Sequence, residues 1–325
     1  MPQPGIPCLS ATCWRPCHFP DGAHTRDRRL LFPLANVTEY VLPLDQLHKV
    51  ARQLLATTDP AEIEEKLGLV LRFAHVINVE WKFDAPLWRG RRCSSSAGYS
   101  SILEVGAPPA HLCGPGRLNE PGKPVLYVST TQHSVFEELG LGDGEYVHLV
   151  GYSMQGNAIR TALLGEYTQV HRWGEASLGS NLGRELKRIL RELDYEVAKS
   201  FLYSDAFLSS LVRDRRAADS EYLRSRVLSR LLFSKLSELN AITYPGIALD
   251  GAMNLAIQPS AASRLLTVGA TCVVMVKRRY DYGIYDFEVV RWGSGHAADG
   301  LINWADRVPT LKRNRKSSLP SERDL

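Results

Sequence analysis

The sequence predicts an α+β protein, and three observations lead to this fold class. Short apolar runs typical of β-strands occupy 124–128, 146–152, 241–244, 254–257, 268–279 and 284–292. Apolar residues at helical spacing occupy 44–55, 60–74 and long stretches of 181–239. Because the helical stretch 181–239 lies between two strand-rich regions, we expect a β-rich domain that carries a helical insertion.

Composition and charge limit the class of protein. The chain has 325 residues, of which 44% are hydrophobic and 23% are charged, so it is neither collagen, nor a coiled coil, nor mainly disordered. A net charge of +4 lacks the global excess typical of nucleic-acid-binding proteins. No apolar run approaches the ~20 residues that span a bilayer, and the proline-rich start does not resemble a signal peptide. We therefore expect a cytoplasmic protein with no membrane partner and no direct nucleic-acid partner.

The first segment, 1–35, is expected to be a disordered leader, because it is rich in Pro, Gly, Cys and Arg and has no hydrophobic periodicity. Three of the six cysteines lie in it, at Cys8, Cys13 and Cys17, with histidines nearby. Their spacing lacks the paired short intervals of a zinc site. Six cysteines in a chain of this length also do not indicate a disulfide framework. We expect no metal.

A small N-terminal helical unit is expected over 36–80. Leucines and a valine at helical spacing predict its first helix over 44–55. The start of its second helix is marked by Asp59 as N-cap, Pro60 in the first turn and Glu62 three residues after the cap.

The rest of the chain is expected to form one domain over 81–293. A short helix is predicted at 130–139, and the helical insertion spans about 176–240. The last two strands are joined by a hairpin turn at Tyr280–Gly283. The polar and basic end, 294–325, is expected to be a flexible tail.

One stretch combines residue types that suit a particular chemistry. Gly114-Pro115-Gly116 allows a tight turn, and Arg117 follows with a guanidinium able to grip a phosphate. Tyr127 lies near the end of the next strand, and Glu138 lies on the helix after it. An arginine for phosphates, an aromatic ring for a base and a carboxylate beside a carbon that becomes cationic describe cleavage of the nicotinamide–ribose bond of NAD.

Each of these residues also has a plain structural interpretation. Arg117 fits a surface turn, Tyr127 fits a core or edge aromatic, and Glu138 fits a solvated helix face beside Glu137. Walker, GxGxxG, GxSxG and HExxH motifs are absent from the sequence, so no common nucleotide or hydrolase signature decides between the two interpretations.

The order of the motifs resembles the RES domain family. The resemblance rests on LWRGRR at 87–92, GPGRLNEPGKPVLYVS at 114–129, a helix that ends near Glu138, and YVHLVGY at 146–152. YPGIALDGAMNLAIQP at 244–259 resembles the closing motif of the family. The resemblance implies an ADP-ribosyltransferase-like fold with twisted β-sheets around a cleft.

The resemblance also implies an activity and partners. Many RES proteins are toxins that degrade NAD, and a co-encoded antitoxin with an Xre-like domain usually neutralises them. NAD would then be the substrate, with no further cofactor, and a homodimer is compatible with the family. The acceptor of the ribosyl group, which is water, phosphate or a protein side chain, stays open.

Carried over position by position, the family motifs assign Arg117, Tyr127 and Glu138 to the catalytic site, Arg117 as the pyrophosphate ligand. The substrate-binding positions implied by the resemblance are Arg89 or Arg91, Asn119, Tyr244, Gly246 and Asn254. If phosphate is the acceptor, Arg89 or Arg91 would supply a second anion site.

Two positions depart from the family pattern. Gly246 stands where the family has a serine, and Leu118 stands where an aromatic residue is common. An alternative hypothesis is therefore a catalytically degenerate RES domain that binds NAD or a partner without turnover. A third hypothesis makes the helical parts, 44–76 and 181–239, an interaction surface, against the plainer interpretation that they cover the sheet.

Overall fold

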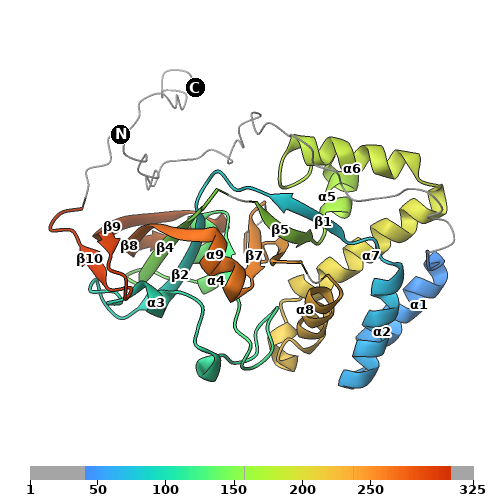
Figure 1. Cartoon of the computed structure of the whole chain (residues 1–325), viewed down its shortest axis with the longest axis horizontal. Helices are drawn as coiled ribbons and strands as arrows, with labels where there is room; N and C mark the ends of the chain where they lie inside the picture. Colours follow the sequence, from blue (N-terminus) through green and yellow to red (C-terminus); the bar gives the residue numbers. More distant parts are fainter. Residues whose placement is uncertain (1–40, 157, 237, 250, 309–325) are drawn as a thin grey trace.

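The computed structural model describes residues 41–308 except 157, 237 and 250, and it confirms the α+β class (Figure 1). The helices are α1 (Leu44–Ala56), α2 (Pro60–Phe73), α3 (Ile102–Val105), α4 (Gln132–Leu139), α5 (Glu166–Trp173), α6 (Ser180–Glu192), α7 (Tyr195–Arg213), α8 (Leu223–Lys235) and α9 (Pro259–Leu265). The strands are β1 (Ile77–Trp81), β2 (Leu87–Cys93), β3 (Leu126–Ser129), β4 (Tyr146–Met154), β5 (Ile159–Leu163), β6 (Ala241–Pro245), β7 (Met253–Ile257), β8 (Leu266–Arg279), β9 (Tyr285–His296) and β10 (Ile302–Trp304).

The strands form one ten-stranded sheet in the order β1-β5-β6-β7-β3-β2-β4-β8-β9-β10. The strands β5 and β6 run parallel, whereas the other neighbouring pairs are antiparallel. The described residues thus build a single mixed sheet in place of the several sheets that were expected. In Figure 1, α1, α2, α7 and α8 lie together beyond one end of this sheet, and β8, β9 and β10 form the other end.

The two faces of the sheet carry different apolar clusters, because successive side chains of a strand point to opposite faces. Leu126, Val128 and Val150 belong to a long cluster on one face, which α5, α6 and the first half of α7 cover. The other face holds two clusters, separated along the sheet. One joins α1, α2, α8 and the end of α7 to Tyr244, and the other joins α4 to Leu149.

The N-terminal helices form as predicted, but not as a separate unit. Asp59 accepts a hydrogen bond from the Ala61 N–H at the start of α2, which confirms the N-cap. The Glu62 carboxylate accepts from the Thr57 hydroxyl (2.6 Å). Both helices pack on α7 and α8, and β1 then enters the sheet beside β5, so residues 41–81 share their core with the rest of the described chain.

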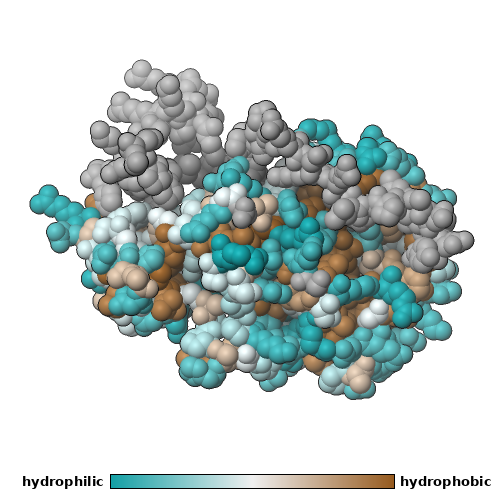
Figure 2. Space-filling model, viewed as in Figure 1, coloured by the Kyte–Doolittle hydropathy of each residue, from teal (hydrophilic) through white to brown (hydrophobic). Residues whose placement is uncertain are grey.

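The helical insertion contains one more break than the pattern predicts. The run 184–202 is divided into α6 and α7, because Asp194 accepts a hydrogen bond from the Glu196 N–H and begins a new helix. The apolar side of α6 packs inward through Leu186 and Ile189, and its outer edge is hydrophilic in Figure 2.

The predicted tail 294–325 begins too early. β9 continues to His296, and β10 pairs with it to complete the edge of the sheet. Ser101 fixes this edge by donating a hydrogen bond from its hydroxyl to the Gly300 carbonyl (3.0 Å). The predicted leader, 1–35, and the end of the tail lie outside the described residues.

Several absences hold for the described part of the chain. None of its helices is long and apolar enough to cross a membrane. It contains no group of three or more His, Cys, Asp or Glu side chains arranged to hold a metal ion. Within it, Cys93, Cys113 and Cys272 are free thiols.

Candidate active site

A group of polar side chains lies between the two apolar clusters that share one face of the sheet. Tyr244 and Asn254 are direct partners in the β6–β7 register, so both side chains point to this face. Tyr127 on β3 packs against the same cluster as Tyr244. Burial raises the pKa of Tyr244, Tyr127 and Glu138 raise it further, and Arg117 lowers it.

Glu138 is exposed on α4 and faces this group. Its Oε1 accepts hydrogen bonds from the Asn254 side-chain amide (2.9 Å) and from the Ile247 backbone N–H (3.2 Å). The Thr131 side chain caps the start of α4, and Gly140 ends the helix with a φ of 58°. The carboxylate is therefore held at a fixed place by two donors while it stays open to solvent.

The neighbouring Glu137 has a different role. Its carboxylate accepts a short hydrogen bond from the Tyr285 hydroxyl and pairs with the Arg279 guanidinium (3.1 Å). Burial and this carboxylate raise the pKa of Tyr285. Glu137 therefore fastens α4 to the β8–β9 hairpin, and of the two glutamates only Glu138 faces the group described above.

Of the two tyrosines, Tyr244 is buried and Tyr127 is half-buried. The Tyr127 hydroxyl accepts from the Leu118 N–H (2.7 Å) and donates to Asn119 Oδ1 (3.0 Å). Tyr244 is 4% exposed. Burial raises the pKa of both phenols, so both are neutral near pH 7.

Arg117 makes internal contacts through one nitrogen of its guanidinium group. Its Nη1 donates to the backbone carbonyls of Val212 (2.6 Å) and Asp214 (2.9 Å), and its guanidinium lies 5.2 Å from the ring centre of Tyr222. Cations favour the carbonyl end of a helix, which is the end of α7 here. The guanidinium thus ties the glycine-rich turn to the helical insertion.

Asn119 is also occupied by internal contacts. Its side-chain amide donates to the carbonyls of Gly114 (2.9 Å) and Glu120 (3.1 Å). A Cβ on Gly116 would lie 2.2 Å from Asn119 Oδ1, so glycine is required at this close approach. In this structure Asn119 shapes the turn.

Arg89 and Arg91 lie away from the Glu138 group. Arg89 is half-buried and donates to the carbonyls of Val105 (2.5 Å) and Tyr127 (3.1 Å), and Arg91 donates to the Glu104 carbonyl (2.6 Å). The intervening Gly90 faces α4, because its Cβ would meet the Val135 side chain. Both arginines therefore point to the opposite face of the sheet, and the second anion site predicted for them is not formed beside Glu138.

Gly246 begins the loop that joins β6 to β7. Its N–H donates to the Ala252 carbonyl (2.7 Å), and a Cβ at this position would lie 2.9 Å from the Leu249 carbonyl oxygen and 3.2 Å from that of Ala252. A side chain at 246 therefore requires the loop backbone to move. The tightness of this loop accounts for glycine where the family pattern has serine.

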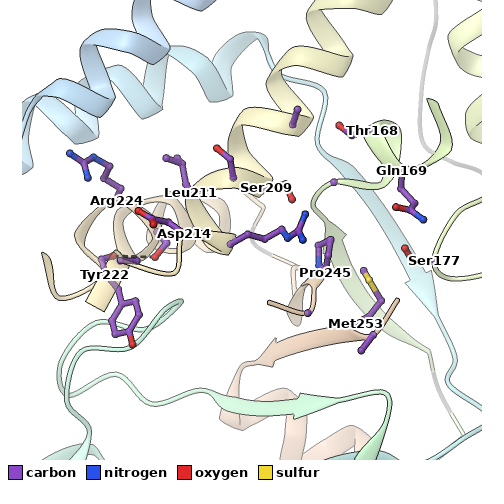
Figure 3. A pocket seen from close by; sticks show the side chains of 18 of the residues that line it. Thr168, Gln169, Ser177, Ser209, Leu211, Asp214, Tyr222, Arg224, Pro245 and Met253 are labelled. Atoms are coloured by element: carbon purple, nitrogen blue, oxygen red, sulfur yellow. Dashed lines mark hydrogen bonds between the residues drawn. The ribbon is translucent and has the colours of Figure 1, made fainter. Parts of the chain in front are cut away.

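A cavity of about 990 Å³ adjoins the loop, and sequence reasoning missed it (Figure 3). Pro245 and Met253 project into it from β6 and β7, and Thr168, Asp214 and Tyr222 come from α5 and the α7–α8 connection. Its described lining includes four arginines, Arg172, Arg213, Arg216 and Arg224. The four arginines share no motif, and Arg172 lies before the predicted helical insertion, so only the arginine-rich stretch at 213–224 could have pointed to part of this lining.

Comparisons with known proteins add one match. No family model matches the chain, and no curated protein matches it. A chain of the crystal structure of the M. tuberculosis MbcT–MbcA toxin–antitoxin complex matches with a TM-score of 0.25 and 9% sequence identity, over 72% of this chain and 91% of that chain. A likeness of this degree assigns no chemistry to this chain.

Proposed function

We propose that this protein cleaves the nicotinamide–ribose bond of NAD, with Glu138 as the catalytic carboxylate. The observation that carries the proposal is the position of Glu138, which is open to solvent and held by the Asn254 amide and the Ile247 N–H. The RES-like order of the sequence motifs supports the choice of NAD as substrate.

The reaction breaks the bond between ribose C1′ and the nicotinamide nitrogen. The electron pair of this bond leaves with the nicotinamide, which becomes neutral, and positive charge develops on C1′. A fixed carboxylate stabilises that charge without reorganisation during the reaction. The acceptor then forms a new bond to C1′, and water as acceptor gives ADP-ribose and a proton.

The residues around Glu138 supply positioning. Asn254 and Ile247 both donate to Oε1, which leaves Oε2 to approach the reacting carbon. Buried Tyr244 and half-buried Tyr127 are neutral phenols on the same face of the sheet as Asn254, so they add no competing negative charge.

The test is release of nicotinamide by the purified protein, with and without inorganic phosphate. We expect Glu138→Gln to lower the rate at least about 100-fold, the usual effect of removing one electrostatic group. Its amide oxygen still accepts from Asn254, so the fold stays intact. Glu137→Gln is the matched control on the same helix, and it retains turnover.

Two results would contradict the proposal in different ways. Equal turnover in the Glu138→Gln variant would remove Glu138 from the chemistry. Binding of NAD by the wild-type protein with no nicotinamide release would favour the catalytically degenerate RES domain instead.

A toxin role and a co-encoded Xre-type antitoxin form the second part of the proposal, and the sequence resemblance supports them. Expression of the wild-type chain is expected to stop bacterial growth and to lower cellular NAD, and expression of the Glu138→Gln variant to do neither. Growth arrest of equal strength by both chains would separate toxicity from NAD cleavage.

A further inference from the structure

The cavity of about 990 Å³ lies where mixed α/β sheets often bind ligands. The parallel strands β5 and β6 end at Leu163 and Pro245, and Gly165 and Pro245 line the cavity. Ligands of open α/β sheets bind outside the carboxyl ends of such strands. The volume is at the upper end of the ~300–1,000 Å³ range of small-molecule sites.

The cavity adjoins the Glu138 group through both ends of one loop. Gly246 lines the cavity, and the next residue, Ile247, donates its N–H to Glu138. At the other end Met253 lines the cavity, and the next residue, Asn254, donates its amide to Glu138. The same loop therefore contacts Glu138 and forms part of the cavity wall.

The charge of the cavity favours an anion. Its described lining holds four arginines and one acidic residue, Asp214. The Asp214 carboxylate accepts a hydrogen bond from the Arg216 backbone N–H in its own turn (2.9 Å). Arg224 donates to the carbonyls at the end of α1 (2.9 Å to Leu55). The side chains of Arg172 and Arg216 are exposed and make no hydrogen bond or ion pair within the described residues.

An exposed tryptophan lines the cavity together with these arginines. Trp173 lines the cavity next to Arg172 and is 75% exposed, an unusual state for a tryptophan in a folded chain. An exposed indole beside guanidinium groups suits a ligand that combines phosphates with a flat base.

We propose that this cavity binds the adenosine diphosphate half of the dinucleotide, with Arg172 and Arg216 on the phosphates and Trp173 against the adenine. The assignment rests on the proposed function, since it places the other half of the same substrate at Glu138. It moves phosphate recognition from Arg117, whose guanidinium is bound to the end of α7, to the helical region between β5 and β6.

The experiment measures binding of ADP, NAD and nicotinamide mononucleotide by calorimetry, together with quenching of tryptophan fluorescence. We expect ADP and NAD to bind at least about 10-fold more tightly than nicotinamide mononucleotide, which lacks the adenosine half. The double variant Arg172→Glu/Arg216→Glu should weaken ADP at least about 10-fold. Trp173→Ala should weaken ADP and remove the quenching.

The control is Arg264→Glu, which reverses the charge of an exposed arginine outside the cavity. A milder pair, Arg172→Gln/Arg216→Gln, tests the same point without adding negative charge. Circular dichroism establishes that each variant is folded.

Three results would overturn the proposal. ADP affinity equal in the double variant and in Arg264→Glu would exclude the cavity. Competition by inorganic phosphate as strong as that by AMP would make it a simple anion site. Tight binding of nicotinamide mononucleotide that depends on Arg216 would place the opposite half of the substrate there. Because binding is read without turnover, absence of nicotinamide release would refute the proposed function and leave this test valid.

Discussion

The glycine-rich turn before β3 and the cavity beside α7 use arginine in opposite ways. Arg117 in the turn donates to two carbonyls at the end of α7 and lies over the Tyr222 ring. Arg172 and Arg216 in the cavity are exposed, and their guanidinium groups have no partner among the described residues. An arginine within a recognisable motif therefore holds this fold together, whereas arginines without a motif are available to a ligand.

The two kinds of arginine should therefore contribute to different properties, one kind to the stability of the fold and the other to ligand binding. Charged donors that satisfy the carbonyls at the end of a helix contribute to folding whether or not a ligand is present. Exposed guanidiniums contribute little to folding and keep their charge for an anion. Substitutions in the two regions should therefore change different measurements.

The largest stability effect is expected at Arg117. Arg117→Ala removes two hydrogen bonds and a cation–π contact and leaves two carbonyls unsatisfied, which should cost about 3 kcal/mol of unfolding free energy. Arg216→Ala should leave the unfolding free energy within about 0.5 kcal/mol. Urea denaturation of both variants measures the difference, and equal losses would show that the two regions do not differ in this way.

A pH effect of similar size is expected from buried carboxyl groups next to residues that line the cavity. Burial raises the pKa of Glu166 to about 7 and also raises that of Asp205, which accepts from the Gly165 and Thr168 N–H groups. Glu166 is thus protonated in the folded chain under conditions in which it ionises in the unfolded chain, where its ordinary pKa is 4.5. Its contribution to stability is present below pH 4.5 and is lost as the pH rises to about 7.

The wild-type protein should therefore lose about 3 kcal/mol of unfolding free energy between acid and neutral pH, and the Glu166→Gln variant should not show this loss. Thermal unfolding of wild type and variant from pH 5 to pH 8 measures it. We expect the difference between the two melting temperatures to grow as the pH rises, with the variant more stable above pH 7. Parallel pH profiles would mean that Glu166 does not titrate in this range.

A smaller effect is expected at the loop between the two regions. Gly246→Ser places a Cβ 2.9 Å from the Leu249 carbonyl oxygen, so the loop must shift, at a cost of about 2 kcal/mol. Because Ile247 holds Glu138 in place, nicotinamide release should fall as well. A gain in release would instead mean that a serine hydroxyl at 246 completes the site.

The smallest effect compares the two adjacent glutamates of α4. Glu137→Gln weakens the contacts to Arg279 and Tyr285 and should cost about 1 kcal/mol of unfolding free energy. Glu138→Gln should change stability by less than about 0.5 kcal/mol. A larger stability loss for Glu138→Gln than for Glu137→Gln would mean that Glu138, and not Glu137, has the structural role.

Much of the fold could be predicted because its strands and helices have strong local patterns. The long apolar runs of β8 and β9 and the capped start of α2 are local signals, and the structure has all three. β2 was missed because three arginines interrupt its apolar pattern, and backbone carbonyls of other segments bind them. α5 was missed because Asp205 of α7, remote in sequence, supplies the acceptor at its N-terminus.

The candidate site was predicted in part for the same reason. Glu138, Tyr127 and Arg117 lie within 22 residues of one another, so a strand and a helix bring them close. The carbonyls that occupy Arg117 lie 95 and 97 residues later, and no local pattern indicates such contacts. The cavity is lined by Leu55 and by residues from 165–177, 206–225 and 245–253, and no local sequence pattern indicates that these meet.

The contacts of Arg117 with residues much later in the sequence have a consequence for synthesis of the chain. Its acceptors at 212 and 214, and Asn254 beside Glu138, are translated well after the motif that contains Arg117. A ribosome-bound chain that has emerged only as far as β5 has neither the end of α7 nor the loop that holds the carboxylate. Under the proposed function, the growing chain is therefore inactive until residues through Asn254 have left the ribosome and folded onto Glu138.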